Sequence, residues 1–343
     1  MVKIYAKDSY KKAKYSPKIR GVIDLFRPFT LLAPLIGGSA AALMALALNP
    51  IPKFANRFIV DGAFISPTFS WSYPFMYWHF PLLELITGVS ALMLVNAGSN
   101  VLNQVYDFKI DKINKPYRPI PSKIITLNEA RTIAWVLYLV TLWRAAAVGS
   151  GAFLFLILVI MLITIFYSIP PIRLKKRLFI SNISIAFARG MLGFVAGWCI
   201  FGDPFDPTPW LIGLIMSIYL IGAVTTKDFT DIPGDEKFGI RTLPVVFGKR
   251  KAITISAPFF VIPFILIPIG ILRGHLIKET LNLIVLIIWG AIIALLLYKY
   301  ADVPDKKFEN TSVWIHMYLM LMAIQLGFCI VYIHAVLVDS IPT

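Results

Sequence analysis

The chain has 343 residues, of which 58% are hydrophobic and only 15% are charged, and its mean hydropathy is +0.76. This charge is too sparse to cover the surface of a soluble protein of this length, so the composition indicates a polytopic membrane protein. The net charge of +15 favours anionic partners at one membrane face. It does not indicate nucleic-acid binding, because the sequence has no basic soluble region interleaved with aromatic residues.

Apolar stretches of about 20 residues predict nine membrane-spanning helices. In chain order they are 29–48, 81–102, 127–147, 153–169, 179–201, 209–226, 252–272, 281–297 and 313–338. We therefore predict an all-α fold, a single transmembrane domain over 1–343 whose nine helices surround a central cavity. A basic N-terminal segment (1–28), without the pattern of a cleavable signal peptide, precedes the first span, and a long outer loop (49–80) precedes the second.

The distribution of basic residues predicts how the chain crosses the membrane. If the N-terminus is cytoplasmic, the inner segments carry 26 Lys and Arg residues and the outer ones five, counting Arg144 at a helix edge. Basic residues concentrate on the cytoplasmic side of membrane proteins. We therefore expect a multi-pass protein of the cell membrane with a cytoplasmic N-terminus and an outer C-terminus.

Two inner segments resemble one another. The segment after the second span reads NQVYDFKIDKINKPYRPIPS (103–122), and the segment after the sixth reads KDFTDIPGDEKFGIRTLP (227–244). Each contains two Asp residues four apart, followed by Arg, Pro and a new apolar helix. Their positions, four helices apart, predict a duplicated four-helix unit with one helix added. Because both lie on the same side, their acidic residues can face each other across the cavity.

The spacing of these acidic residues predicts a metal–diphosphate site. The two sets are Asn103, Asp107 and Asp111, and Asp228, Asp231 and Asp235. The first set shares one helix face, whereas Pro233 and Gly234 predict that a regular helix does not extend through Asp235. Clustered carboxylates repel unless a cation neutralises them, and hard oxygen ligands favour Mg²⁺ shared with substrate phosphates. A solvated acidic loop would not explain the repetition.

These motifs are similar to those of a known family. NQVYDFKID resembles the NxxxDxxxD motif, and KDFTDIPGD the second Asp-rich motif, of the UbiA family of intramembrane prenyltransferases. RPFT (27–30), YSIPPIRLKK (167–176) and GDEKFGIRTLPVVFGKR (234–250) resemble other family segments. The chain departs from the family in the long loop 49–80 and at Gln104, where many members have Asp.

The resemblance implies Mg²⁺-dependent transfer of a prenyl group from a polyprenyl diphosphate to a lipophilic acceptor within the membrane. Asp107, Asp111, Asp231 and Asp235 would be catalytic, and Asn103 and Asp228 would complete the metal ligands. The segments 167–176 and 240–248 favour a quinone-precursor aromatic or related ring compound as acceptor. The alternative is archaeal ether-lipid synthesis, in which a geranylgeranyl group passes to a prenylated glycerol phosphate.

Several residues near the motifs are candidates for binding the diphosphate. They are Arg118, Lys227, Arg173, Lys175 and Tyr167, with Ser168 beside them. For Arg173 and Lys175 a role as cytoplasmic topology markers is an equal alternative, and for Tyr167 a place at the membrane interface. The remaining basic residues of the first loop, Lys109, Lys112, Lys115 and Lys123, are expected only to keep that loop in the cytoplasm.

One charged residue lies inside a predicted span. Arg189 is about three turns from the cytoplasmic end of the fifth helix. A charge at this depth is costly and predicts a function; the alternative is that the side chain extends back to the headgroups.

Two other classes of protein share parts of this pattern. A cation transporter also carries acidic residues on interrupted helices, but here the acids gather at cytoplasmic helix ends. Membrane CDP-alcohol phosphotransferases use Asp and Mg²⁺, but their single compact signature is missing from the sequence. The sequence predicts neither the prenyl chain length nor the oligomeric state.

Overall fold

The structure, a computed structural model, describes residues 16–48, 59–60, 63–64, 73–302 and 311–339. Most of the predicted outer loop 49–80 and residues 1–15 of the basic N-terminal segment lie outside the described residues. The assignment of one domain to the whole chain stays a prediction.

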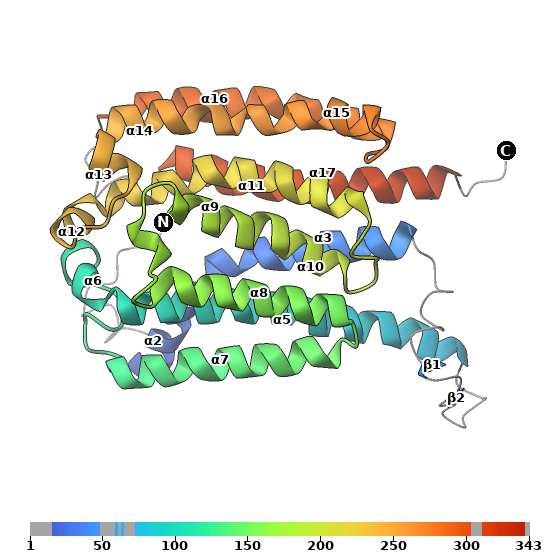
Figure 1. Ribbon diagram of the computed structural model, residues 1–343, viewed down its shortest axis with the longest axis horizontal. Coiled ribbons are helices and arrows are strands. Elements are labelled where there is room, and N and C mark those ends of the chain that lie inside the picture. Colours follow the sequence, from blue (N-terminus) through green and yellow to red (C-terminus); the bar gives the residue numbers. More distant parts are fainter. Residues whose placement is uncertain (1–15, 49–58, 61–62, 65–72, 303–310, 340–343) are drawn as a thin grey trace.

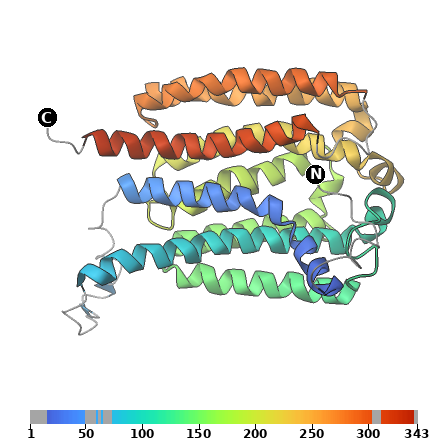
Figure 2. The same cartoon turned by 180° about the vertical axis from the view of Figure 1, so that it is seen from behind.

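The long helices lie side by side and follow one axis (Figures 1 and 2). The longer elements are α2 (Pro17–Phe26), α3 (Leu32–Leu48), α5 (Tyr73–Tyr106), α7 (Leu127–Ala147), α8 (Gly151–Ser168), α11 (Pro207–Lys227), α14 (Lys249–Ser256), α16 (Leu286–Lys299) and α17 (Ser312–Asp339). Two rods are built from consecutive pieces: α9 (Ile180–Ala186), the π-helix η4 (Phe187–Leu192) and α10 (Gly193–Trp198), and, after α14, the 3₁₀ turns η6 (Ala257–Phe260) and η7 (Ile262–Ile265) with α15 (Leu266–Leu272).

Short elements join the rods or form their ends. They are η1 (Pro28–Leu31), α6 (Phe108–Asn114), η3 (Leu174–Lys176), η5 (Asp228–Thr230), α12 (Ile232–Lys237), α13 (Leu243–Phe247) and η8 (Lys278–Val285). The strands β1 (Ile59–Val60) and β2 (Ala63–Phe64) form a two-residue antiparallel pair. The helices α6 and α12, which carry the two Asp-rich motifs, pack together at the same end of the bundle (Figure 1).

Eight segments are long and apolar enough to cross a membrane, and they match eight of the nine predicted spans. They are Pro17–Leu48, Leu82–Tyr106, Gly151–Ser168, Ile180–Trp198, Pro207–Thr230, Lys249–Leu272, Lys278–Lys299 and Ser312–Val338. The other predicted span is α7, a helix of 21 residues that packs along α5 and α8. Arg131 and Arg144 lower its hydropathy, so the spanning role of α7 stays a prediction. The all-helical membrane fold itself is confirmed.

The interruption of the second motif was misplaced. The helical path breaks at Asp231, between η5 and α12, and not at Pro233. Pro233 lies in the first turn of α12, where its missing N–H costs no hydrogen bond, so Asp235 lies within that short helix. The helix α5 begins at Tyr73, ahead of the predicted span 81–102.

A polar row on α5 fixes the bend where the chain enters its first span. Asn96, Asn100 and Gln104 donate side-chain hydrogen bonds of 2.8–3.0 Å to carbonyl groups between Leu25 and Thr30. These carbonyls belong to the junction of α2, η1 and α3, where helical hydrogen bonding is interrupted. Gln104, the departure from the family motif, therefore has a structural task at this bend.

Small residues let the rods approach closely. A Cβ added to Gly197 of α10 would lie 2.9 Å from the Cα atom of Gly38 on α3. A Cβ on Gly190 of η4 would lie 2.8 Å from the Cα atom of Ser217 on α11. Such close contacts are typical of helix packing in membranes, and they hold η4 and α10 in place beside the cavity described below.

Candidate active site

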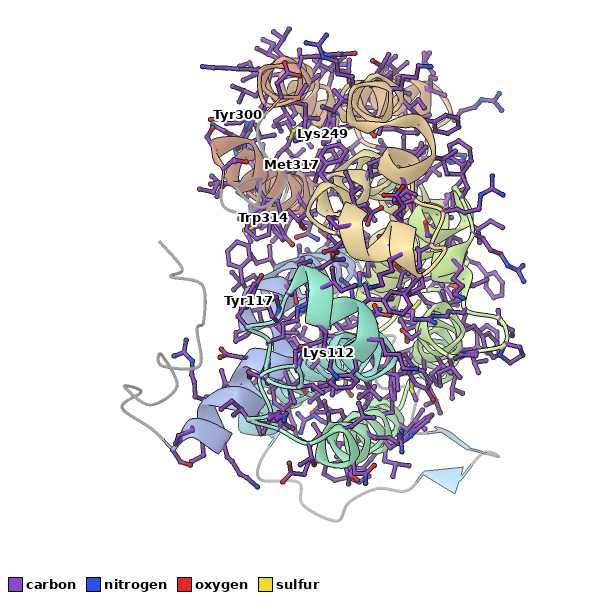
Figure 3. The ribbon with its side chains drawn as sticks, turned by 90° about the vertical axis from the view of Figure 1, so that its left-hand side faces the viewer. Lys112, Tyr117, Lys249, Tyr300, Trp314 and Met317 are labelled. Carbon is purple, nitrogen blue, oxygen red and sulfur yellow. The ribbon has the colours of Figure 1, made fainter. Side chains whose placement is uncertain are left out.

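The two Asp-rich motifs line one polar pocket of about 40 Å³ at the α6–α12 end of the bundle. Figure 3 looks onto this end, with Lys112 marking α6. All six predicted metal ligands contribute to the pocket wall: Asn103, Asp107, Asp111, Asp228, Asp231 and Asp235. The i to i−4 main-chain hydrogen bonds continue from Asn103 through Asp107 to Asp111, so the first three share one face as their spacing predicts.

Cations from two segments neutralise the first acidic motif. Arg118 Nη1 donates to both carboxylate oxygens of Asp111 at 2.7 Å. Asp107 Oδ1 accepts a 3.1 Å hydrogen bond from Arg173 Nη2 and pairs with Lys175 Nζ. Arg173 and Lys175 come from the loop after α8. These ion pairs place both residues in the pocket region, beyond a role as topology markers.

The second acidic motif is paired across the pocket. Lys115, which follows α6, forms a 2.5 Å ion pair with Asp231. Lys227 Nζ lies 3.8 Å from Asp228. Asp235 is buried, with 6% of its area exposed, and has no ion pair among the described residues.

Burial and neighbouring charges shift the pKa values of Asp235 and Asp231 in opposite directions. Burial, together with the negative charges of Asp228 and Asp231, raises the pKa of Asp235 to about 8. Burial would also raise the pKa of Asp231, but Lys115 and Arg118 outweigh it and hold this pKa below its ordinary value. Without a further cation the pocket therefore keeps one carboxyl protonated at neutral pH.

The side-chain amide of Asn114 also connects the two motifs. Asn114 Nδ2 donates to the carbonyl of Asp231 at 2.8 Å, and Asn114 Oδ1 accepts from the N–H of Gly234 at 2.8 Å. Gly234 has to be small, because an added Cβ would lie 2.5–2.7 Å from the amide atoms of Asn114. This side chain therefore sets the distance between α6 and α12.

The other predicted site residues are placed as follows. Tyr167, Lys175, Lys227 and Arg118 line the pocket with the acids. Ser168 is fully buried and its hydroxyl makes no hydrogen bond within the described part of the chain, and it is not part of the pocket wall. Arg189 lines a second, larger cavity.

Sequence reasoning was wrong about Lys115, which is buried in the pocket instead of only holding the loop in the cytoplasm. Its position, four residues after Asp111, continues the spacing of the first motif and was a usable signal. Arg27, Ser181 and Thr242 also line the pocket and were missed. Arg27 has a left-handed backbone (φ 53°) at the end of α2, which the sequence does not reveal. Lys109, Lys112 and Lys123 are exposed, as expected of residues that only mark topology.

A cavity of about 760 Å³ lies among the helices next to the pocket, and Arg27, Arg118, Lys115 and Lys227 line both. Its wall is otherwise largely apolar or aromatic. Three of its lining residues, Tyr117, Trp314 and Met317, are labelled in Figure 3, on the side where α17 lies. Phe29, Trp314 and Tyr318 form a ring cluster in this wall, with centroids 4.5–5.5 Å apart.

The arrangement suits a ligand with an anionic head and a long apolar tail. Carboxylate and amide oxygens with surrounding cations can hold a metal and a diphosphate, and the adjoining cavity has the size of a ligand site. Within the described residues no three carboxylate, His or Cys side chains converge on one metal position, because the carboxylates are turned towards Lys and Arg.

Comparison with known proteins identifies the family. The family model described as the UbiA prenyltransferase family matches residues 64–320. The chain belongs to the UbiA prenyltransferase family. This membership confirms the predicted resemblance and the enzyme class, a prenyltransferase, and leaves the cation transporter without support.

Relatives and solved structures of the UbiA prenyltransferase family agree with this assignment. The chain is 31% identical over 226 residues to digeranylgeranylglyceryl phosphate synthase of Methanosphaera stadtmanae, covering 65% of the chain and 79% of the relative. It is 32% identical over 205 residues to the chloroplastic chlorophyll synthase of Avena sativa, covering 57% of the chain and 51% of the relative. A UbiA homolog from Archaeoglobus fulgidus bound to DMAPP and Mg²⁺ shares the fold, with a TM-score of 0.65, 21% identity, and coverage of 93% of this chain and 99% of that one.

Proposed function

We propose that this prenyltransferase moves a prenyl group from a polyprenyl diphosphate to a prenylated glycerol phosphate, with Mg²⁺ as cofactor. The observation that carries the proposal is the polar pocket, where two acidic motifs and their cations adjoin a large apolar cavity. The diphosphate head would occupy the pocket and the prenyl tail the cavity. The ether-lipid acceptor, the alternative of the sequence analysis, is supported by the Methanosphaera relative, 79% of which is covered.

The donor atoms of the pocket fit Mg²⁺. Five carboxylates and the amide of Asn103 line the pocket, and hard oxygen ligands of this kind suit Mg²⁺. When bound, Mg²⁺ supplies positive charge that stabilises the departing diphosphate. The carboxylates that would hold it are now paired with Lys115, Arg118, Arg173 and Lys175, and metal binding would free these cations for the diphosphate oxygens.

The transfer breaks the bond between C1 of the prenyl chain and the diphosphate oxygen, and the electron pair leaves with the diphosphate. The acceptor's hydroxyl oxygen forms the new bond to C1, and its proton passes to a diphosphate oxygen. The cations of the pocket stabilise the charge on the leaving group. The apolar wall of the cavity limits the access of water, which would otherwise attack C1 and hydrolyse the donor.

The experiment is a product assay with purified protein in detergent, geranylgeranyl diphosphate, Mg²⁺ and geranylgeranylglyceryl phosphate, read by mass spectrometry. We expect a doubly prenylated glycerol phosphate, no product with a chelator, and a rate lower by on the order of 100-fold or more for Asp107→Asn. Asp302→Asn is the matched control, because Asp302 is 75% exposed and pairs with Arg250 outside the pocket. Wild-type turnover by Asp107→Asn, or without Mg²⁺, would contradict the proposal.

A ring compound is the second candidate acceptor, as the sequence analysis favoured. It is supported by the 32% identity to a chlorophyll synthase, although only 51% of that relative is covered. The same assay with a chlorophyllide or a quinone-precursor aromatic in place of the glycerol phosphate distinguishes the two, because only the true acceptor gives a prenylated product at a useful rate.

A further inference from the structure

Arg189 carries a charge into the interior of the bundle. It lies nine residues after the first residue of α9, about 13 Å along the rod, within the span Ile180–Trp198. Its side chain lines the large cavity and reaches Asn100 on α5, so it does not extend back to the headgroups outside the molecule. A guanidinium at this depth is costly unless a partner compensates it.

Within the described part of the chain, this charge has a neutral hydrogen-bond partner and no ionised one. Arg189 Nη2 donates a 3.2 Å hydrogen bond to Asn100 Oδ1, and no carboxylate of the described residues forms an ion pair with it. The groups close enough to interact with it electrostatically are the phenols of Tyr138, Tyr167 and Tyr318. A guanidinium has five N–H donors, so most of its capacity for binding an anion is open towards the cavity.

Hydrogen bonds and helix packing hold Arg189 in its position. Asn100 is 3% exposed, and its Nδ2 group donates to the Phe26 carbonyl and to Thr30 Oγ1 at 3.0 and 2.9 Å. Its carbonyl oxygen is thereby aimed at Arg189. The backbone around Arg189 is a π-helix, η4, a distortion that is frequent at functional sites, and the contact of Gly190 with α11 fixes it.

We propose that Arg189, held by Asn100, binds the anionic group of the acceptor, a phosphate monoester under the proposed function on which this inference rests. The polar pocket has its own cations for the diphosphate of the donor, whereas Arg189 does not line that pocket and lines the adjoining cavity. Asn100 on α5 precedes Asp107, the residue directly after α5, by seven residues, about 10 Å along the helix axis. An acceptor anchored at Arg189 therefore lies within reach of the reacting end of a donor bound at the acids.

The position of Arg189 in the cavity also makes cleavage of the donor depend on the presence of the acceptor. Positive charge develops on the allylic carbon as the diphosphate leaves, and an unneutralised guanidinium in a low-dielectric cavity opposes it. The phosphate of a bound acceptor neutralises Arg189 and removes that opposition. Arg189 thus suppresses cleavage of the donor by water while the acceptor is missing.

The test compares Arg189→Met and Arg189→Lys with wild type, using two acceptors, geranylgeranylglyceryl phosphate and its dephosphorylated alcohol. For Arg189→Met we expect the KM of the phosphorylated acceptor to rise at least about tenfold, the KM of geranylgeranyl diphosphate to stay within about twofold, and the preference for the phosphorylated acceptor to disappear. Release of diphosphate without acceptor should increase relative to transfer. Arg189→Lys should keep part of the preference, because it keeps the charge.

Arg131→Met is the matched control, because Arg131 is exposed on α7 and outside both the pocket and the cavity. Donor binding by labelled geranylgeranyl diphosphate reports on folding and on the proposed function separately. A wild type that fails to bind the donor overturns the proposed function. A donor-binding Arg189→Met variant that keeps the full preference for the phosphorylated acceptor overturns the role of Arg189 alone.

Discussion

Lys115 and Asp231 show how single residues keep the acidic pocket folded before any metal arrives. The side chains of the pair are 4% and 19% exposed, so removing one partner leaves a charge with little water around it. Breaking a buried ion pair in this way destabilises proteins by about 3–5 kcal/mol. A bound divalent cation is the natural substitute for the missing ammonium group.

We therefore predict that Lys115→Met lowers the thermal unfolding midpoint in detergent, and that millimolar Mg²⁺ restores much of the loss. Lys112→Met is the control, since Lys112 is exposed on α6 three residues earlier and its loss should change the midpoint little. Thermal unfolding with and without Mg²⁺ measures both effects. A Lys115→Met protein whose deficit is the same with and without Mg²⁺ would show that no metal approaches Asp231.

The residues of this pocket were predictable to the extent that they repeat along one segment. The spacing of four residues pointed to Asp107 and Asp111, and it extends to Lys115, which was misjudged because its three basic neighbours are exposed. Arg27 was missed because its place depends on a left-handed backbone at a bend. Such a bend is fixed by contacts with α5 that no local pattern encodes.

At the scale of elements, the connection of α6 to α12 decides whether the two motifs can act together. Each helix has only six or seven residues, too short to be stable by itself. Asn114 joins them with two hydrogen bonds to the main chain. The sequence predicted that the motifs face each other, but the residue that joins them became visible only when both helices were placed.

A double-mutant cycle tests this connection. Asn114→Ala removes two hydrogen bonds, worth about 0.5–1.5 kcal/mol each, and should raise the Mg²⁺ concentration needed for half-maximal activity. Gly234→Ala should do the same, because its Cβ would collide with the amide of Asn114. In the Asn114→Ala background that collision is gone, so Gly234→Ala should add little. Activity titrated with Mg²⁺ in the four proteins measures the coupling, and strictly additive effects would exclude the contact.

The helices themselves were the most predictable level, because a membrane requires long apolar segments with satisfied backbones. The inclusion of Asp235 in α12 was missed because Pro233 stands in the first turn of that helix, where proline costs no backbone hydrogen bond.

At the scale of the whole molecule, the bundle has two unlike ends. The acidic pocket, its cations and the exposed Lys109, Lys112 and Lys123 lie at one end. A prenyl diphosphate carries several negative charges, so it reaches the pocket only from the side on which it is made, because such a charge does not cross hydrocarbon. The positive-inside rule assigns the same end to the cytoplasm, and the two arguments are independent.

Labelling with cysteine tests this orientation. The two native cysteines, Cys199 and Cys329, are free and buried. We therefore expect little background labelling from them, and both can be replaced by Ala. We predict that a membrane-impermeant maleimide labels Phe205→Cys on intact cells, since Phe205 is 91% exposed. Residue 205 belongs to the connection between α10 and α11, and this connection lies at the end of the bundle away from α6 (Figure 1). Lys112→Cys on α6 should be labelled only after the membrane is opened.

Neither side chain lines the pocket or the cavity, so both variants should keep their activity, and that activity shows that the labelled protein is correctly folded. The reverse labelling pattern in active protein would place the acidic pocket outside the cell, where a donor made in the cytoplasm could not reach it.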